Sequence, residues 1–123
     1  MPAPRDERHR LLDILASIHL IRERLAGETL ATLTRNLEKL DSIERRLEII
    51  SEASRHIPAP MQDLHPEIPW RGVADFGNIL RHAYDGVEYE RLWRVLQDEL
   101  EPLRLAILDL YERLRRPGDP NPP

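Results

Sequence analysis

Apolar residues recur every three or four positions along most of this chain, the spacing that places them on one face of an α-helix. One helix is expected over about residues 6–25, a short one over residues 28–36, and a long one from there to about residue 56. Asp41 and Glu44 could cap a break in the long helix, but we favour continuity. Its apolar stripe consists of Leu37, Leu40, Ile43, Leu47, Ile50, Ala53 and Ile57.

The eleven prolines are confined to particular segments, which separates helices from connections. Proline lacks the backbone N–H and clashes with the preceding helical turn, so it is excluded from most helix interiors. The proline-rich segment 57–69 is therefore expected to be a surface connection with one helical turn around residues 61–64. Pro69 suits the first position of a further helix, which we expect to end near residue 85.

A last helical region is expected over residues 88–116, with Pro102 kinking or splitting it near Leu100. The chain has few glycines and no alternating run of β-branched residues, which leaves little support for strands. We therefore predict an all-α, up-and-down bundle of four main helices with an extra short helix. The length of 123 residues suits one domain, residues 1–116, followed by a disordered proline-rich tail, residues 117–123.

Polar residues of an unusual kind cluster in the helix expected before residue 85. At about 100° per residue, Asp75, Asn78, Arg81, His82 and Asp85 share one side of that helix, and apolar residues take the other side. Asn, His and Asp are poor helix formers, so helix stability does not explain their presence. The pattern alone leaves two interpretations open, an ordinary solvated face and a chemically active one.

Composition narrows the chemistry that this chain could perform. It contains no cysteine, which excludes thiolate catalysis, and no apolar run that could span a bilayer, so a cytoplasmic location is expected. A net charge of −4 disfavours a general polyanion binder, so any contact with RNA must be local. Six aromatic residues are too few for an extended base-stacking surface. No metal-binding motif is present, and His56 and His65 are interpreted as surface residues.

Two parts of the sequence resemble one family. Residues 46–53, RLEIISEA, are similar to the segment RLeiiGEA of HepT-like toxins of the HEPN superfamily. That family also has a signature of Arg, Asn, three residues, His, any residue and Tyr. Asn78, His82 and Tyr84 fall on its Asn, His and Tyr. The resemblance extends over most of the chain.

The resemblance implies a homodimer that cleaves RNA without metal or cofactor, at a cleft where two motif helices meet. It implies that His82 is the general acid or base. Asn78 is then expected to orient its imidazole or to donate to phosphate, and Asp85 to fix its tautomer. The resemblance also implies that the chain is the toxin of a toxin-antitoxin system. Its partner would be a minimal nucleotidyltransferase antitoxin, which transfers AMP to the equivalent of Tyr84.

One position departs from the signature, because Gly77 stands where the family has its arginine. Helical side chains lean toward the N-terminus, so we expect Arg81 to reach over the surface left open at Gly77 and to replace the missing guanidinium. Glu52 matches the Glu of the family's segment and is either solvated or a buried partner of Arg81 or of a backbone donor beside the motif helix. The alternatives to a nuclease are a catalytically silent module that binds a nucleotidyltransferase or a nucleotide, and a structural helical dimer.

Overall fold

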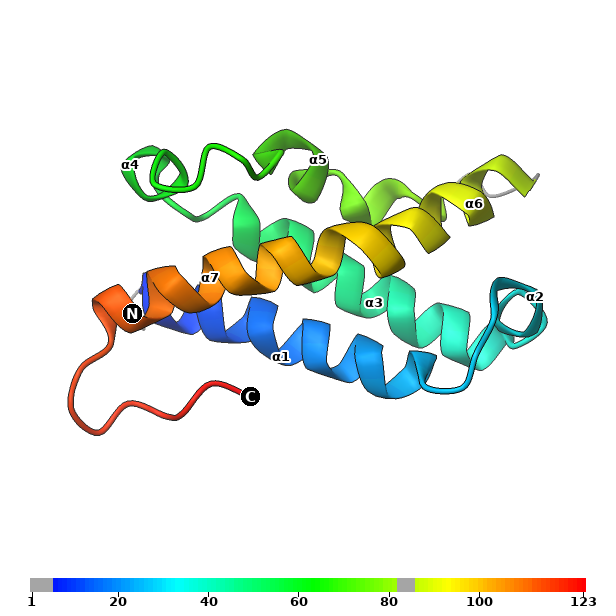
Figure 1. The fold of residues 1–123 in the computed structure, drawn as a ribbon, viewed down its shortest axis with the longest axis horizontal. Coiled ribbons are helices and arrows are strands. Elements are labelled where there is room, and N and C mark those ends of the chain that lie inside the picture. Colours follow the sequence, from blue (N-terminus) through cyan, green and yellow to red (C-terminus); the bar gives the residue numbers. More distant parts are fainter. Residues whose placement is uncertain (1–5, 82–85) are drawn as a thin grey trace, which may run out of the picture.

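The computed structural model describes residues 6–81 and 86–123, and the helices in these ranges pack into one bundle (Figure 1). The long helices are α1 (Glu7–Leu25), α3 (Leu37–Ser54) and α7 (Leu100–Leu114), and α6 (Gly86–Arg94) leads into α7 through a π-helical turn, η2 (Val95–Glu99). The connections hold the short helices α2 (Leu30–Leu33), α4 (Ala59–Gln62) and α5 (Trp70–Ala74) and the 3₁₀-helix η1 (Phe76–Asn78). The described ranges contain no strand, which confirms the all-α prediction.

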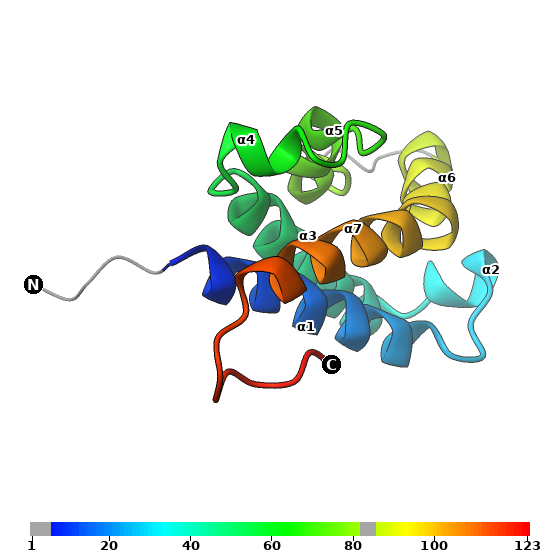
Figure 2. The ribbon, with the colours of Figure 1, turned by 60° about the vertical axis from the view of Figure 1, so that its left-hand side comes forward.

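The helix α3 is the element around which the bundle is arranged. It packs against α1 on one side and against α5 and η1 on the other (Figure 1, Figure 2). The helix begins after Asn36, whose side chain accepts a hydrogen bond from the Lys39 N–H at 3.1 Å. It runs without a break past Asp41 and Glu44, as expected. None of the helices in residues 6–81 and 86–123 has the length and apolar character needed to cross a bilayer.

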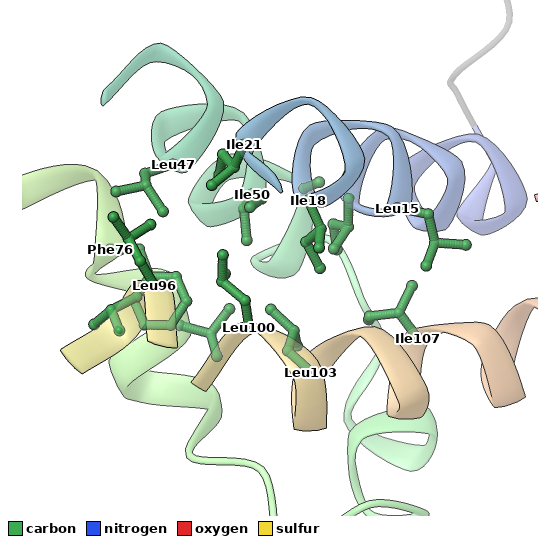
Figure 3. Close-up of a cluster of buried hydrophobic side chains, with 14 of the residues drawn as sticks. Leu15, Ile18, Ile21, Leu47, Ile50, Phe76, Leu96, Leu100, Leu103 and Ile107 are labelled. Carbon is green, nitrogen blue, oxygen red and sulfur yellow. The ribbon is translucent and has the colours of Figure 1, made fainter. Parts of the chain in front are cut away.

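Apolar side chains from α1, α3, η1, η2 and α7 point toward one another and form the core (Figure 3). The predicted stripe of α3 is buried with one exception, Leu37, whose side chain is 69% exposed. The predicted stripe begins one turn too early, because Leu37 is the first residue of α3 and lies beyond the end of the core. Phe76 is buried beside Leu47 and Leu96, so it anchors η1 to the bundle.

The transition from α6 to α7 confirms the disruption predicted from Pro102. The Leu100 N–H donates to the Val95 carbonyl, five residues back instead of four, which defines the π-helical turn. Pro102 has no N–H to donate to the carbonyl of Asp98, and its ring crowds that carbonyl. One extra residue in the turn lets the chain continue as a helix past the proline.

The C-terminal segment, residues 117–123, folds back along α1 and α7 without forming a helix or strand. The Asp119 carboxylate lies 2.6 Å from the Arg8 guanidinium of α1. The Tyr111 hydroxyl donates to the Pro120 carbonyl at 2.6 Å. The segment that we expected to be disordered therefore has side-chain contacts at both neighbouring helices.

The connection between α4 and α5 is fixed to α7 by His65, which corrects its interpretation as a surface residue. The His65 side chain is only 17% exposed, and its Nε2 lies 2.7 Å from an Asp109 carboxylate oxygen of α7. Its Nδ1 lies 3.0 Å from Glu67. Burial lowers the pKa of His65, but the hydrogen bonds with Asp109 and Glu67 outweigh it, so the pKa is raised.

This contact predicts a pH-dependent contribution to stability. Because the His65 pKa is raised on folding, the contribution is complete below about pH 6.5 and is lost as the pH rises through the folded-state pKa. We expect His65→Gln to lower the free energy of unfolding by about 1 kcal/mol at pH 6 and by less at pH 9. Urea denaturation at both pH values measures this, with His19→Gln, an exposed histidine of α1, as control. Equal losses at both pH values would contradict the assignment.

Candidate active site

The segment with the polar residues is not one continuous α-helix, which corrects the helix predicted over residues 69–85. After α5 the chain forms η1 and then turns through residues 79–81. Backbone hydrogen bonds here span three residues, as when the Asn78 N–H donates to the Asp75 carbonyl at 2.9 Å. Because residues three apart are aligned in 3₁₀ winding, Asp75, Asn78 and Arg81 still share one side.

A serine of α3 explains the break. In a continuous α-helix the Gly77 N–H would donate to the Val73 carbonyl. Instead the Ser51 hydroxyl lies between them: its Oγ accepts from the Gly77 N–H at 2.7 Å and donates to the Val73 carbonyl at 3.2 Å. A side chain inserted into the backbone hydrogen-bond ladder is a recognised cause of sharp kinks. Ser51 therefore both breaks the helix and fixes η1 against α3.

This arrangement predicts that Ser51→Ala destabilises the fold. The substitution would leave the buried Gly77 N–H without an acceptor, which costs about 1–3 kcal/mol. Urea denaturation measures the change, and Ser42→Ala serves as a control on the same helix, because the Ser42 hydroxyl bonds only the side chain of Arg24 among the described residues. A loss no larger than that of the control would show that the hydroxyl does not hold η1.

The close contact at Gly77 corrects the expectation of an open surface there. Gly77 is buried, and a Cβ added to it would lie 3.2 Å from the Glu48 Cα and 3.3 Å from the Ser51 Oγ. The first of these atoms is backbone and cannot move away without shifting α3. A side chain at position 77 therefore requires α3 to shift by a few tenths of an ångström, and Arg81 does not lean over a vacant surface.

Arg81 nevertheless lies in the cavity between α3 and η1. This cavity has a volume of about 260 Å³, and three arginines and one asparagine are among the residues that line it. Two carboxylates accompany them, each 3.4 Å from an arginine of the same helix, so these ion pairs are long and solvated. The lining residues are Arg45, Glu48, Ser51, Glu52, Arg55, Gly77, Asn78 and Arg81.

The side chain of Asn78 is oriented by Asp75. The Asn78 Nδ2 donates to an Asp75 carboxylate oxygen at 2.7 Å, and Arg91 of α6 donates to the other oxygen at 3.1 Å. These two hydrogen bonds, that of Asn78 first, hold the pKa of Asp75 below its usual range. Asp75 therefore remains ionised at neutral pH, and the position of the Asn78 amide depends on a residue of α6.

Glu52 is a solvated residue at the rim of the cavity, so the interpretation as a buried partner of Arg81 is wrong. Its side chain is 61% exposed and contacts His56 at 3.1 Å and Arg55 at 3.4 Å. These hydrogen bonds, that of His56 first, lower the pKa of Glu52. Arg55 also donates to the Ala74 carbonyl at 2.6 Å and so joins α3 to the end of α5.

The remaining predicted site residues, His82, Tyr84 and Asp85, lie outside the described residues. The described part of the site adds Arg45 and Arg55, which were not among the predicted site residues. Both could have been found from the sequence, because arginines ten positions apart in a helix lie within about 80° of each other and so share one face. Within residues 6–81 and 86–123 no cluster of His, Asp and Glu has the arrangement of a metal site.

Known proteins resemble this chain over most of its length. The family described as "Ribonuclease HepT-like" matches residues 14–110. A protein of Thermococcus cleftensis named "Probable ribonuclease HepT" is 35% identical over 112 residues, which cover 91% of this chain and 98% of the relative. A protein of Methanocaldococcus jannaschii named "putative RNase" is 31% identical over 103 residues, 84% of this chain and 94% of the relative. No solved structure matches the chain.

The all-α bundle and the motif segment packed on its α3 helix define a protein of the HEPN class. The chain belongs to the HepT-like ribonuclease family. This confirms the family predicted from residues 46–53 and from the signature that includes Asn78.

Proposed function

We propose that this protein is a metal-independent endoribonuclease. The observation that supports this most directly is the cavity that Arg45, Arg55 and Arg81 line together with Asn78. In the sequence, His82 directly follows Arg81. Guanidinium groups bind phosphate and stabilise charge that develops on phosphoryl oxygens. A groove of this kind gives an acidic chain, with a net charge of −4, a local site for RNA.

The proposed reaction uses the 2′-hydroxyl of the RNA as the nucleophile. Its oxygen attacks the adjacent phosphorus, the bond from phosphorus to the 5′-oxygen breaks, and that oxygen leaves with a proton. His82 either removes the proton of the 2′-hydroxyl as general base or supplies the proton to the leaving 5′-oxygen as general acid. Asn78 donates to a phosphoryl oxygen or orients the imidazole, and Asp85 fixes its tautomer. Arg81 stabilises the charge on the phosphoryl oxygens.

Cleavage of single-stranded RNA in the presence of EDTA tests this proposal. Products should carry a 2′,3′-cyclic phosphate and a 5′-hydroxyl, because the 2′-oxygen displaces the 5′-oxygen. A requirement for added Mg²⁺ or Mn²⁺, or products with a 5′-phosphate, would contradict the proposed chemistry.

We further propose that the protein is the toxin of a toxin-antitoxin system and is neutralised by a minimal nucleotidyltransferase antitoxin. The Tyr84 hydroxyl would attack the α-phosphorus of ATP, forming a phosphodiester with AMP and releasing pyrophosphate. The proposal is supported by membership of the family and by the tyrosine two residues after His82. A bulky anion two residues after His82 would repel the phosphates of a bound RNA.

Labelling with radioactive ATP and the cognate nucleotidyltransferase tests the role of Tyr84. Wild-type protein and Tyr89→Phe should both acquire AMP, whereas Tyr84→Phe should not. Equal labelling of Tyr84→Phe would refute the assignment, and loss of RNA cleavage on labelling would link modification to neutralisation.

A catalytically silent module that binds a nucleotidyltransferase or a nucleotide is the second candidate function. Gly77 favours it, because the signature's arginine is absent and a Cβ at this position would lie only 3.2 Å from the Glu48 Cα. The two candidates share the expected homodimer, the expected AMP transfer and the same fold. They differ in one measurement, since a silent module leaves RNA intact whatever residue occupies position 82.

A further inference from the structure

A second cavity adjoins the candidate active site on the side of α6. It has a volume of about 190 Å³ and lies between the start of α3, the turn after η1 and α6. Arg81 lines both cavities, so they meet at its side chain. The lining residues are Leu37, Leu40, Asp41, Glu44, Leu80, Arg81 and Tyr89.

One wall of this second cavity is apolar and exposed to solvent. Leu37 was expected in the core but is 69% exposed at its edge, and Leu80 and the half-buried Tyr89 continue the wall. An exposed leucine next to an aromatic ring provides the flat apolar contact against which a nucleobase packs. A single tyrosine suffices for one base, although the chain has too few aromatic residues for an extended stacking surface.

The α3 side of the cavity, which includes Leu37, also carries two carboxylates, Asp41 and Glu44, one turn apart. Burial, followed by the nearby charges of Glu48 and Asp41, raises the pKa of Glu44, whereas the charge of Arg81 lowers it. Arg81 and Glu44 therefore lie within electrostatic range of each other. Two carboxylates repel phosphate but accept hydrogen bonds from amino groups, so they suit the edge of a base and not the RNA backbone.

We propose that this cavity binds the base next to the phosphate held at Arg81 and selects adenine, cytosine or guanine over uracil. The proposal rests on the proposed ribonuclease function and specifies its substrate. Adenine, cytosine and guanine each carry an exocyclic amino group that a carboxylate can accept from, and uracil carries none. Leu37 and Tyr89 contact the faces of the base, Asp41 and Glu44 accept from its edge, and Arg81 binds the adjoining phosphate.

Binding of oligonucleotides that cannot be cleaved tests the pocket without depending on catalysis. Fluorescent 2′-O-methyl hexanucleotides lack the attacking hydroxyl, and they are compared as all-uridine or with one central A, C or G. We expect wild-type protein to bind the A, C or G oligonucleotide at least about fivefold more tightly than the all-uridine one. Asp41→Asn with Glu44→Gln should abolish this preference, and Leu37→Ala should weaken binding of the preferred oligonucleotide.

The matched control is Glu38→Gln with Glu90→Gln, which removes two charges from exposed residues of α3 and α6 outside the cavity. It should strengthen the binding of all four oligonucleotides equally and keep the preference. Equal binding of all four by wild type, or an unchanged preference after Asp41→Asn with Glu44→Gln, would overturn the proposal.

The oligomeric state and the cleavage of RNA are measured beside the binding comparison. If Leu37→Ala dissociates a dimer, as seen by light scattering, and leaves the base preference unchanged, a second copy of the chain covers this face and the proposal is wrong. Cleavage of the corresponding unmodified RNA is followed in parallel. Its absence would end the proposed ribonuclease function, whereas the binding comparison still decides the base pocket.

Discussion

Replacement of His82 by alanine should reduce the rate of RNA cleavage by about 10²–10⁴-fold, the contribution of a positioned general acid or base. His82 directly follows Arg81 in the sequence, and its imidazole has a pKa ordinarily close to neutrality, so it can both accept and release a proton. RNA binding should change little, because the guanidinium groups of Arg45, Arg55 and Arg81 remain. We therefore expect the substitution to lower kcat and to leave KM nearly unchanged.

The control for this experiment is His19→Ala, which removes an exposed histidine of α1 outside the residues that line the arginine cavity. His19→Ala should cleave RNA at the wild-type rate. The pH dependence of kcat/KM provides a second readout, since the limb of the wild-type profile that His82 governs should be absent from His82→Ala. If His82→Ala retained full activity, the cleaving group would lie elsewhere, or the activity would come from a contaminating nuclease.

The main helices could be predicted because proline and apolar spacing report directly on helix geometry. The proline-rich segment 57–69 separated α3 from α5, and Pro102 marked the π-helical turn before Leu100. Both effects are local, since they depend on a missing N–H and on a ring within one turn of the chain. The exposure of Leu37 could not be predicted in the same way, because it depends on where the partner helices end.

The break in the motif segment could not be predicted because its cause lies on another helix. Residues 70–85 have an acceptable helical pattern by themselves, and the Ser51 hydroxyl interrupts them only after α3 has packed against them. A serine in a helix commonly forms hydrogen bonds with its own backbone or with water. The presence of a serine at position 51 therefore does not predict a hydrogen bond with a residue 26 positions later. The same packing explains why Gly77 is needed, since a Cβ there would meet the Glu48 backbone.

The polar side of the site was predicted in part. Asn78 and Arg81 share one side of the chain, as expected, although 3₁₀ winding and not an α-helix aligns them. Arg45 and Arg55 were missed because arginine is abundant in this sequence, where Lys39 is the one lysine among 18 basic residues. Abundance weakens the signal of any individual arginine. The structure identifies Arg45 and Arg55 because both line the same cavity of about 260 Å³ as Asn78.

Replacement of Arg81 by alanine should reduce the rate of RNA cleavage by about 10²–10³-fold, the usual effect of removing one group that stabilises transition-state charge. Gly77 carries no cation, so in this chain the cation of the signature must come from another residue. Arg81 is the candidate because it lines the cavity with Asn78 and directly precedes His82. Arg81→Lys should recover part of the rate, since it keeps the charge but loses the two-pronged contact with phosphate.

Arg113→Ala provides the matched control, because Arg113 is an exposed arginine of α7 that pairs with Asp109 and does not line the cavity. It removes the same charge and should leave the rate within a factor of about two, since an exposed pair contributes little. Single-turnover cleavage measures the chemical step for wild type, Arg81→Ala, Arg81→Lys and Arg113→Ala. If Arg81→Ala cleaved RNA as fast as wild type while His82→Ala did not, Arg81 would not replace the missing arginine. Arg45→Ala and Arg55→Ala, each measured in the same way, would then identify which other cation of the cavity does.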